Sequence, residues 1–136
     1  MSLHLLSDPD FLSFWAARHL CTVTTPRPDG SLHVTPMGIV LDAEARQAWG
    51  VTMDHSVKAR NVRAGERVQV AVCQLDGPYW ASLEGTAEIL TDPVSVRRAE
   101  ALYASRYRQP RENPTRVALR ITLTRALGRV PERAEA

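Results

Sequence analysis

Residues 68–90 read VQVAVCQLDGPYWASLEGTAEIL, and this stretch decides the fold. Its first part, 68–75, is apolar and β-branched. Its second part, 79–90, alternates between small or apolar residues and polar ones, and this period of two predicts strands with one buried face. The residues expected on the buried face are Ala81, Leu83, Gly85, Ala87 and Ile89. Asp76-Gly77-Pro78 favours a tight turn between the two runs, so the stretch predicts an antiparallel hairpin.

Similar runs on both sides of this hairpin predict further strands, and capped segments between them predict helices. Pro36 interrupts one strand, which implies an edge position or a bulge. Asp8, Ser56 and Asp92 are residue types that cap helices. The expected strands cover 20–25, 32–41, 47–52, 68–75, 79–90 and 116–127, and the expected helices cover about 9–19, 57–64 and 93–107. Six strands with tight turns favour a closed or nearly closed antiparallel barrel, because closure removes exposed sheet edges.

Length and composition set the class of protein. The chain has 136 residues, of which 44% are hydrophobic and 24% charged, so we expect one domain over residues 1–136 with frayed ends at 1–7 and 129–136. No apolar run approaches the roughly 20 residues of a membrane span, and residues 1–10 are too short and polar for a signal peptide. Cys21 and Cys73 lie in strand-like runs, which predicts packed, reduced thiols and a cytoplasmic location. The chain has no C-x-x-C pair and no clustered histidines, which argues against a metal site.

Charge is distributed unevenly along the chain. The net charge is +2, but residues 1–96 carry 7 basic and 11 acidic side chains, whereas residues 97–136 carry 10 basic and 4 acidic ones. A basic C-terminal third favours an anionic ligand or partner. The alternative, of at least equal weight, is that these arginines are solvated on exposed faces.

Residues 55–62, HSVKARNV, are a candidate anion site. Ser56, Lys58, Arg60 and Asn61 stand at the start of a short predicted helix, where backbone N–H groups and the positive end of the helix dipole favour phosphate. Lys58 is the only lysine in a chain with 16 arginines, which suggests a geometric requirement for it. The alternative is a surface helix with ordinary solvated charges.

Residues 33–38, HVTPMG, are a second candidate. Pro36 and Gly38 leave this strand with fewer ladder partners and less side-chain bulk, so a flat ring system can approach its backbone. The alternative is a bulge with a structural purpose only, and Met37 is a common core residue. Trp80 opens the long strand and is suited to a packed core, a dimer interface or a barrel rim where it covers a ring.

Three arginines are the remaining candidates. Arg106, Arg108 and Arg111 make SRYRQPRENP, residues 105–114, the densest basic stretch. They are suited to bind carboxylates, and a solvated loop is the alternative.

The usual arrangements of protein catalytic groups are missing from the sequence. The histidines at positions 19, 33 and 55 form no triad pattern with a serine and an aspartate, and neither a nucleophile elbow nor a P-loop occurs. The lack of an acid–base cluster fits chemistry that a cofactor supplies.

Four segments, taken together in order and spacing, resemble a known family. They are RHLCTVTT with DGSLHVTPMG within 18–38, HSVKARNV at 55–62, DGPYWASLEGTAEI at 76–89 and YASRYRQPRENPTRV at 103–117. The chain resembles the pyridoxamine 5′-phosphate oxidase-like split-barrel superfamily and, within it, the small deazaflavin-dependent reductases of actinobacteria. The fourth segment is particularly similar to the F420-dependent biliverdin reductases of mycobacteria. The resemblance covers about Phe11 to Gly128.

This resemblance implies a β-dominated α+β fold, namely a six-stranded antiparallel split β-barrel with flanking helices. It also implies a homodimer with two equivalent cofactor sites at the interface, each binding F420 or, as the alternative, FMN. The cofactor-binding residues that it implies are Ser56, Lys58, Asn61 and Arg60 at the phosphate, Thr35, Pro36 and Met37 along the ring, and Trp80 over the ring from the partner subunit. Arg106, Arg108 and Arg111 are candidates for the oligoglutamate tail of F420 or for an acidic substrate.

The expected function follows from the same resemblance. We expect an F420-dependent reductase that transfers a hydride to a conjugated acceptor, such as a biliverdin-like tetrapyrrole, and we assign no catalytic side chain because the cofactor carries the chemistry. The alternatives are an FMN-dependent oxidase or reductase and a non-enzymatic flavin or haem carrier. Nucleic acid is a weaker option as a partner, since the aromatic residues, 6% of the chain, do not interleave with the arginines. We expect no membrane partner.

Overall fold

The hairpin expected at residues 68–90 lies at the middle of the sheet in a computed structural model that describes residues 3–17 and 19–132. Strands β5 (Val68–Asp76) and β6 (Tyr79–Leu90) pair without interruption from Val68 opposite Ala87 to Asp76 opposite Tyr79. The alternation of buried and exposed residues along β6 agrees with the predicted faces. The hairpin is therefore confirmed.

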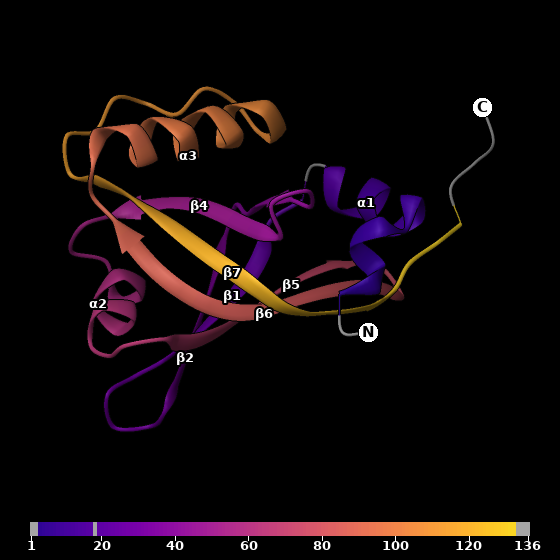
Figure 1. Cartoon of the computed structure of the whole chain (residues 1–136), viewed down its shortest axis with the longest axis horizontal. Helices are drawn as coiled ribbons and strands as arrows, with labels where there is room; N and C mark the ends of the chain where they lie inside the picture. The colour runs from indigo at the N-terminus through magenta and orange to yellow at the C-terminus, as the bar shows by residue number, and fades with distance from the viewer. Residues whose placement is uncertain (1–2, 18, 133–136) are drawn as a thin grey trace.

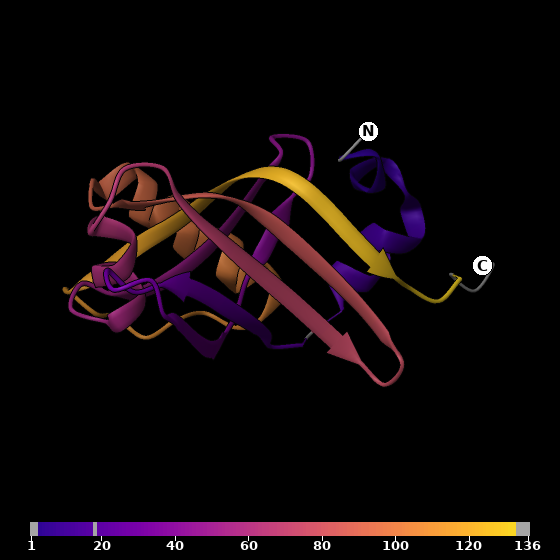
Figure 2. The same ribbon diagram turned by 90° about the horizontal axis from the view of Figure 1, so that it is seen from below.

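All strands of the described residues form one antiparallel sheet in the order β2-β1-β5-β6-β7-β4-β3. The remaining strands are β1 (Cys21–Pro26), β2 (Leu32–Met37), β3 (Val40–Asp42), β4 (Gln47–Met53) and β7 (Arg116–Arg129). The long strands β6 and β7 run side by side across the molecule (Figure 2). The sheet curls into a split barrel, as expected, but it is not closed, because β2 and β3 keep free edges.

The sheet has seven strands where six were expected. The run 32–41 divides at Gly38 and Ile39 into β2 and β3, which then belong to opposite edges of the sheet. No local pattern in LHVTPMGIVL marks this division. The edge position implied by Pro36 is confirmed, since β2 is an edge strand.

Three α-helices and a short 3-10 helix flank the sheet (Figure 1). They are η1 (His4–Ser7), α1 (Pro9–Ala16), α2 (Val57–Arg63) and α3 (Pro93–Arg106). The side chains of Asp8, Ser56 and Asp92 accept backbone N–H groups at the starts of α1, α2 and α3, so the three predicted caps are confirmed. No helix in the described part of the chain is long and apolar enough to cross a membrane.

The N-terminal residues and the end of helix α1 differ from expectation. Residues 4–7 were expected to fray, yet they form η1 and bury Leu6 in the core. Helix α1 ends at Ala16 and not near His19, because Ala17 is already extended. Arg18, residues 1–2 and residues 133–136 lie outside the described residues.

The main core fills the inside of the barrel. It contains the inward residues of β1, β5, β6 and β7 together with α1, and its largest fully buried side chains include Phe11, Trp15, Leu83 and Ile121. A second, smaller cluster of Trp49, Ala99 and Ala118 holds α3 against the outside of β4 and β7. Helix α2 closes one end of the barrel with Ala59, Asn61 and Val62.

A β-bulge bends the pairing of β6 with β7. Glu84 lies opposite Arg125 and the next residue, Gly85, lies opposite Leu123, so Thr124 is the extra residue of β7. The Thr124 hydroxyl donates to the Glu84 carbonyl at 3.3 Å. A Cβ at Gly85 would lie 2.1 Å from the Thr122 carbonyl oxygen. The bulge therefore requires glycine here, and it supplies the curvature that the barrel needs.

We expect Gly85→Ala to lower the free energy of unfolding by about 1–3 kcal/mol, because backbone atoms must move to admit the methyl group. Urea unfolding followed by circular dichroism measures the change. Gly65→Ala is the matched control, because its Cβ meets a side-chain methyl of Val68 at 3.3 Å and not a carbonyl. An equal loss in both variants would contradict this account of the bulge.

Candidate functional site

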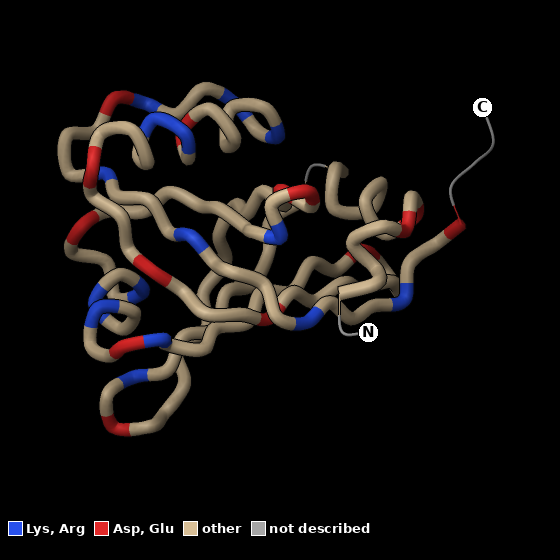
Figure 3. The backbone as a smooth tube through the Cα atoms, in the orientation of Figure 1, with Lys and Arg blue, Asp and Glu red and all other residues tan. Residues whose placement is uncertain are grey.

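Strand β2 and helix α2 together build the candidate site. Strand β2 offers a free edge, since β1 is its only neighbour in the described sheet. Helix α2 follows β4 and packs on the end of the barrel beside β1 and β6. Figure 3 shows the basic residues of α2 close to the β1–β2 turn. The predicted phosphate segment therefore lies near the beginning of the predicted ring segment.

Ser56 serves first as the cap of α2. Its hydroxyl oxygen accepts from the Ala59 backbone N–H at 3.1 Å and from the Thr52 hydroxyl at 2.9 Å. A hydroxyl has two acceptor positions and one donor, so the O–H proton of Ser56 remains available to an outside acceptor.

Lys58 is a half-buried cation without a carboxylate partner among residues 3–17 and 19–132. Burial lowers the pKa of its ammonium group, and no acidic neighbour opposes the effect. By contrast Arg63, on the same helix, is paired with Asp54 at 2.5 Å. Arg60 is exposed. The positive charge of Lys58 is thus left for a ligand to neutralise.

Asn61 is only 6% exposed and its amide is already engaged. Its Nδ2 donates to the Thr25 hydroxyl of β1 at 3.0 Å. The bond fixes α2 against the barrel, so Asn61 positions Lys58. A direct contact between Asn61 and a phosphate remains a prediction.

The three residues expected along the ring do not share one surface. Met37 is 8% exposed and packs in the main core, and Thr35 is half-buried on the same face of β2. Pro36 is exposed on the opposite face. A ring beside β2 would therefore meet Thr35 and the backbone of the free edge, while the Met37 side chain packs in the core.

Gly38 is close to aromatic rings, but they belong to the protein itself. A Cβ at Gly38 would lie 2.9 Å from Tyr107 and 3.0 Å from Tyr103, and these two rings lie 5.0 Å apart. Burial raises the pKa of Tyr107 to about 12, so its hydroxyl stays protonated and donates to the His19 carbonyl at 2.7 Å. The rings of Tyr103 and Tyr107 therefore occupy the space that Gly38 leaves open.

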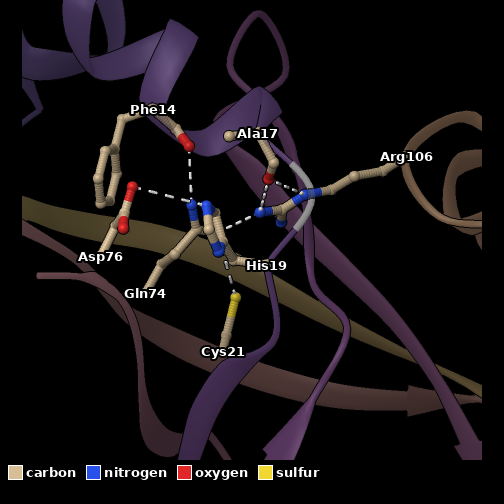
Figure 4. A network of polar contacts seen from close by, with 7 residues as sticks. All are labelled: Phe14, Ala17, His19, Cys21, Gln74, Asp76 and Arg106. Atoms are coloured by element: carbon tan, nitrogen blue, oxygen red, sulfur yellow. Dashed lines mark hydrogen bonds and ion pairs between the residues drawn. The ribbon is translucent and has the colours of Figure 1, made fainter.

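Arg106 is engaged in a network of polar contacts with the backbone (Figure 4). Its guanidinium donates to the carbonyls of Ala17 and Ile39 and to the side-chain oxygen of Gln74. Gln74 in turn donates to the Phe14 carbonyl at 2.7 Å and accepts from the Cys21 thiol. Most donors of Arg106 thus have acceptors within the chain, which leaves little for a cofactor tail.

The same guanidinium lies over aromatic rings and beside a buried thiol. It stacks on Trp15 at 5.4 Å and on Tyr107 at 5.0 Å. Burial raises the pKa of the Cys21 thiol, and the charge of Arg106 opposes this rise. A cavity of about 240 Å³ lies next to Arg106, between α1 and β3.

Arg108 and Arg111 lie in the loop after α3 and are exposed. Their guanidinium groups make no ion pair with the acidic residues that the structure describes. Trp80 is exposed on the outer face of β6, opposite Leu75 of β5. The roles of these three residues stay predictions.

Sequence analysis included His33 in the candidate segment 33–38 without giving it a role, and it did not assign Arg27 to the site. His33 lies on β2 opposite Thr25, and the charges of Arg27 and Lys58 both act on its ring. Only the pairing of β2 with β1 and the position of α2 bring these residues together, so no local pattern indicates it.

The residues present fit an anionic, phosphate-bearing group. Lys58 supplies a charge without a carboxylate, Ser56 supplies a free O–H, and His33 has a buried Nδ1 atom without a hydrogen-bond partner. The part of the chain described here holds no group of three residues suited to a metal ion. A ligand recognised by positive charge and hydrogen-bond donors therefore fits the site best.

Comparisons with known proteins agree with this geometry. The family model described as pyridoxamine 5′-phosphate oxidase matches residues 7–129. An F420H(2)-dependent biliverdin reductase of Mycobacterium tuberculosis is 44% identical over 124 residues, which cover 90% of this chain and 88% of that protein.

Solved structures have the same fold. A conserved hypothetical protein of Mycobacterium tuberculosis aligns over 95% of this chain and 91% of its own, with a TM-score of 0.75 and 24% identity. A protein described as an F420 reductase aligns over 85% of this chain and 94% of its own, with a TM-score of 0.67 and 22% identity.

We expect Arg106→Gln to lower the free energy of unfolding by about 2–4 kcal/mol, because the oxygen acceptors of the buried residues Ile39 and Gln74 lose their donor. Arg108→Gln is the matched control and should change it by less than about 0.5 kcal/mol, since Arg108 is exposed. Chemical denaturation of both variants measures the difference. Equal stability would contradict the structural role of Arg106.

Proposed function

The chain belongs to the pyridoxamine 5′-phosphate oxidase family, and we propose that it is an F420-dependent oxidoreductase. Lys58 is the observation that carries the proposal, because it is a half-buried ammonium without a carboxylate partner in the described chain, placed beside a free strand edge. The 44% identity to an F420H(2)-dependent biliverdin reductase supports this choice of cofactor. The proposed acceptor is a conjugated molecule of the biliverdin type.

Each residue of the site has a defined task in this proposal. Lys58 attracts the phosphate, the Ser56 O–H donates to it, and Asn61 holds α2 in place through Thr25. The free edge of β2 and the Thr35 side chain line the ring. When bound, the reduced deazaflavin supplies the hydride, and the chain needs only to hold donor and acceptor in contact.

Arg108 and Arg111 are the basic residues that remain free to meet carboxylates. Their exposure suits either the oligoglutamate tail of F420 or an acidic substrate. Arg60 is exposed in the last turn of α2 and adds a positive charge to the helix that carries Lys58. We propose a cytoplasmic location, because Cys21 and Cys73 are free thiols on opposite faces of adjacent strands.

FMN is the second candidate cofactor, because the family model is that of pyridoxamine 5′-phosphate oxidase. A phosphate at Lys58 would suit FMN equally well. FMN has no oligoglutamate tail, however, so Arg108 and Arg111 would have less to bind. The two cofactors thus differ in whether they have carboxylates that Arg108 and Arg111 can bind.

We also propose that the protein is a homodimer. The outer face of β2, β1, β5, β6 and β7 carries exposed large apolar residues among polar side chains such as Thr24, Gln69 and Glu84. These apolar residues are Leu32, Val34, Leu75, Trp80 and Leu127. A groove of about 370 Å³ runs along this face between Leu32 and Glu84. A second copy would cover the face and bring its own Trp80 toward the site.

We expect Lys58→Ala to weaken F420 binding at least about tenfold, because a charge-assisted contact is lost. Titration followed by F420 fluorescence, repeated with FMN, measures the affinities. Arg97→Ala is the control, since it removes one exposed positive charge from α3 and should bind as the wild type does. Tighter binding of FMN than of F420 would favour the second candidate, and binding of neither would overturn the enzyme proposal.

We expect Val34→Glu to convert the dimer to a monomer, because each interface would bury an unpaired carboxylate. Sedimentation velocity measures the oligomeric state. Val94→Glu is the matched control, because Val94 is 69% exposed on α3, away from the proposed face. A wild-type monomer, or a Val34→Glu dimer, would contradict this interface.

A further inference from the structure

His33 lies where the free edge of β2 meets α2. It is directly opposite Thr25 of β1, whose hydroxyl accepts from Asn61 of α2 at 3.0 Å. Its side chain is on the same face of β2 as that of Thr35. The imidazole is therefore next to both segments of the candidate site.

The two nitrogens of this imidazole have different surroundings. Nδ1 is buried and has no hydrogen-bond partner, whereas Nε2 is not enclosed in this way and the ring as a whole is half-buried. A proton on Nδ1 would be a buried donor without an acceptor, which is costly. The proton of the neutral ring therefore belongs on Nε2, which is the accessible nitrogen.

The charges around His33 also favour the neutral ring. Burial, followed by the charges of Arg27 from the β1–β2 turn and Lys58 from α2, lowers its pKa. Asp29 is the acidic residue of that turn, but its carboxylate accepts from the Ser31 backbone N–H at 2.9 Å and hydroxyl at 2.6 Å. His33 is thus a neutral donor beside an unpaired cation at pH 7.

We propose that His33 is a further binding residue of the site, and that its neutral Nε2–H group donates a hydrogen bond to the anionic group that Lys58 attracts. The inference rests on the proposed function for the identity of the ligand. The bond adds direction to the charge of Lys58 without adding a second charge.

A dependence on pH follows. A bound anion favours the imidazolium form, so the pKa of His33 is higher in the complex than in the free protein. Binding then takes up a proton once the pH falls into the range between these two values. The affinity for the anion is therefore constant above the upper value and rises as the pH falls below it.

The first measurement uses the protein without any ligand. Long-range ¹H–¹⁵N correlation spectra of ¹⁵N-histidine-labelled protein distinguish the two neutral tautomers and the imidazolium form. We expect the Nε2–H tautomer of His33 at pH 7, assigned by comparison with His33→Gln. The Nδ1–H tautomer or an imidazolium at pH 7 would overturn the inference.

The second measurement is F420 binding by fluorescence at pH 7.5 and pH 5.5. His33→Leu should weaken binding about two- to tenfold at pH 7.5, because one neutral hydrogen bond is lost. His33→Gln keeps a neutral donor, so it should bind within about threefold of the wild type at pH 7.5 but lack the gain at pH 5.5. Any titration of F420 itself is common to all variants and cancels in their ratios.

These outcomes separate the inference from the proposed function. If Lys58→Ala loses binding while His33→Leu binds as the wild type does, the inference fails and the function stands. If wild type binds neither F420 nor FMN, the proposed function fails and the inference fails with it. Should His33→Leu not fold, the tautomer and the pH response of His33→Gln still decide the question.

Discussion

The guanidinium of Arg106 is the contact on which the open barrel depends. Strands β2 and β3 do not pair, so hydrogen bonds of the sheet cannot hold the seam between them. Arg106 binds the Ile39 carbonyl at this seam, the Ala17 carbonyl at the end of α1 and Gln74 on β5. It thereby joins four segments that the sheet alone leaves separate.

Local patterns predicted much of this fold, and the reasons are physical. The alternation in β6 gave its bounds and its buried face, and the caps at Ser56 and Asp92 gave the starts of α2 and α3. These features depend on neighbouring residues. The space over Gly38 is occupied by the rings of Tyr103 in α3 and of Tyr107 directly after it, which are distant in sequence. No pattern within residues 32–41 carries that information.

The candidate site was predicted in part for the same reason. Lys58 stands out in the sequence as the single lysine, and the structure gives it an unpaired position. Arg106 was expected to meet a ligand, but its main partners are 89, 67 and 32 residues away in sequence. Arg98, Arg116 and Arg120 are likewise paired with Asp42, Glu100 and Glu88. Much of the basic character of the C-terminal third therefore stabilises the fold.

The two-residue connection at Gly38 and Ile39 keeps the seam between β2 and β3 narrow at one end. Three peptide units join Met37 to Val40, so at this point the two edges can be at most about 11 Å apart. No short connection limits the distance between the two edges at the far end of β2, near Leu32. The two edges of the seam are therefore held together at Gly38, beneath Tyr103 and Tyr107, and are free to separate at the other end. A longer connection would let the two edges lie farther apart while every strand stays in register.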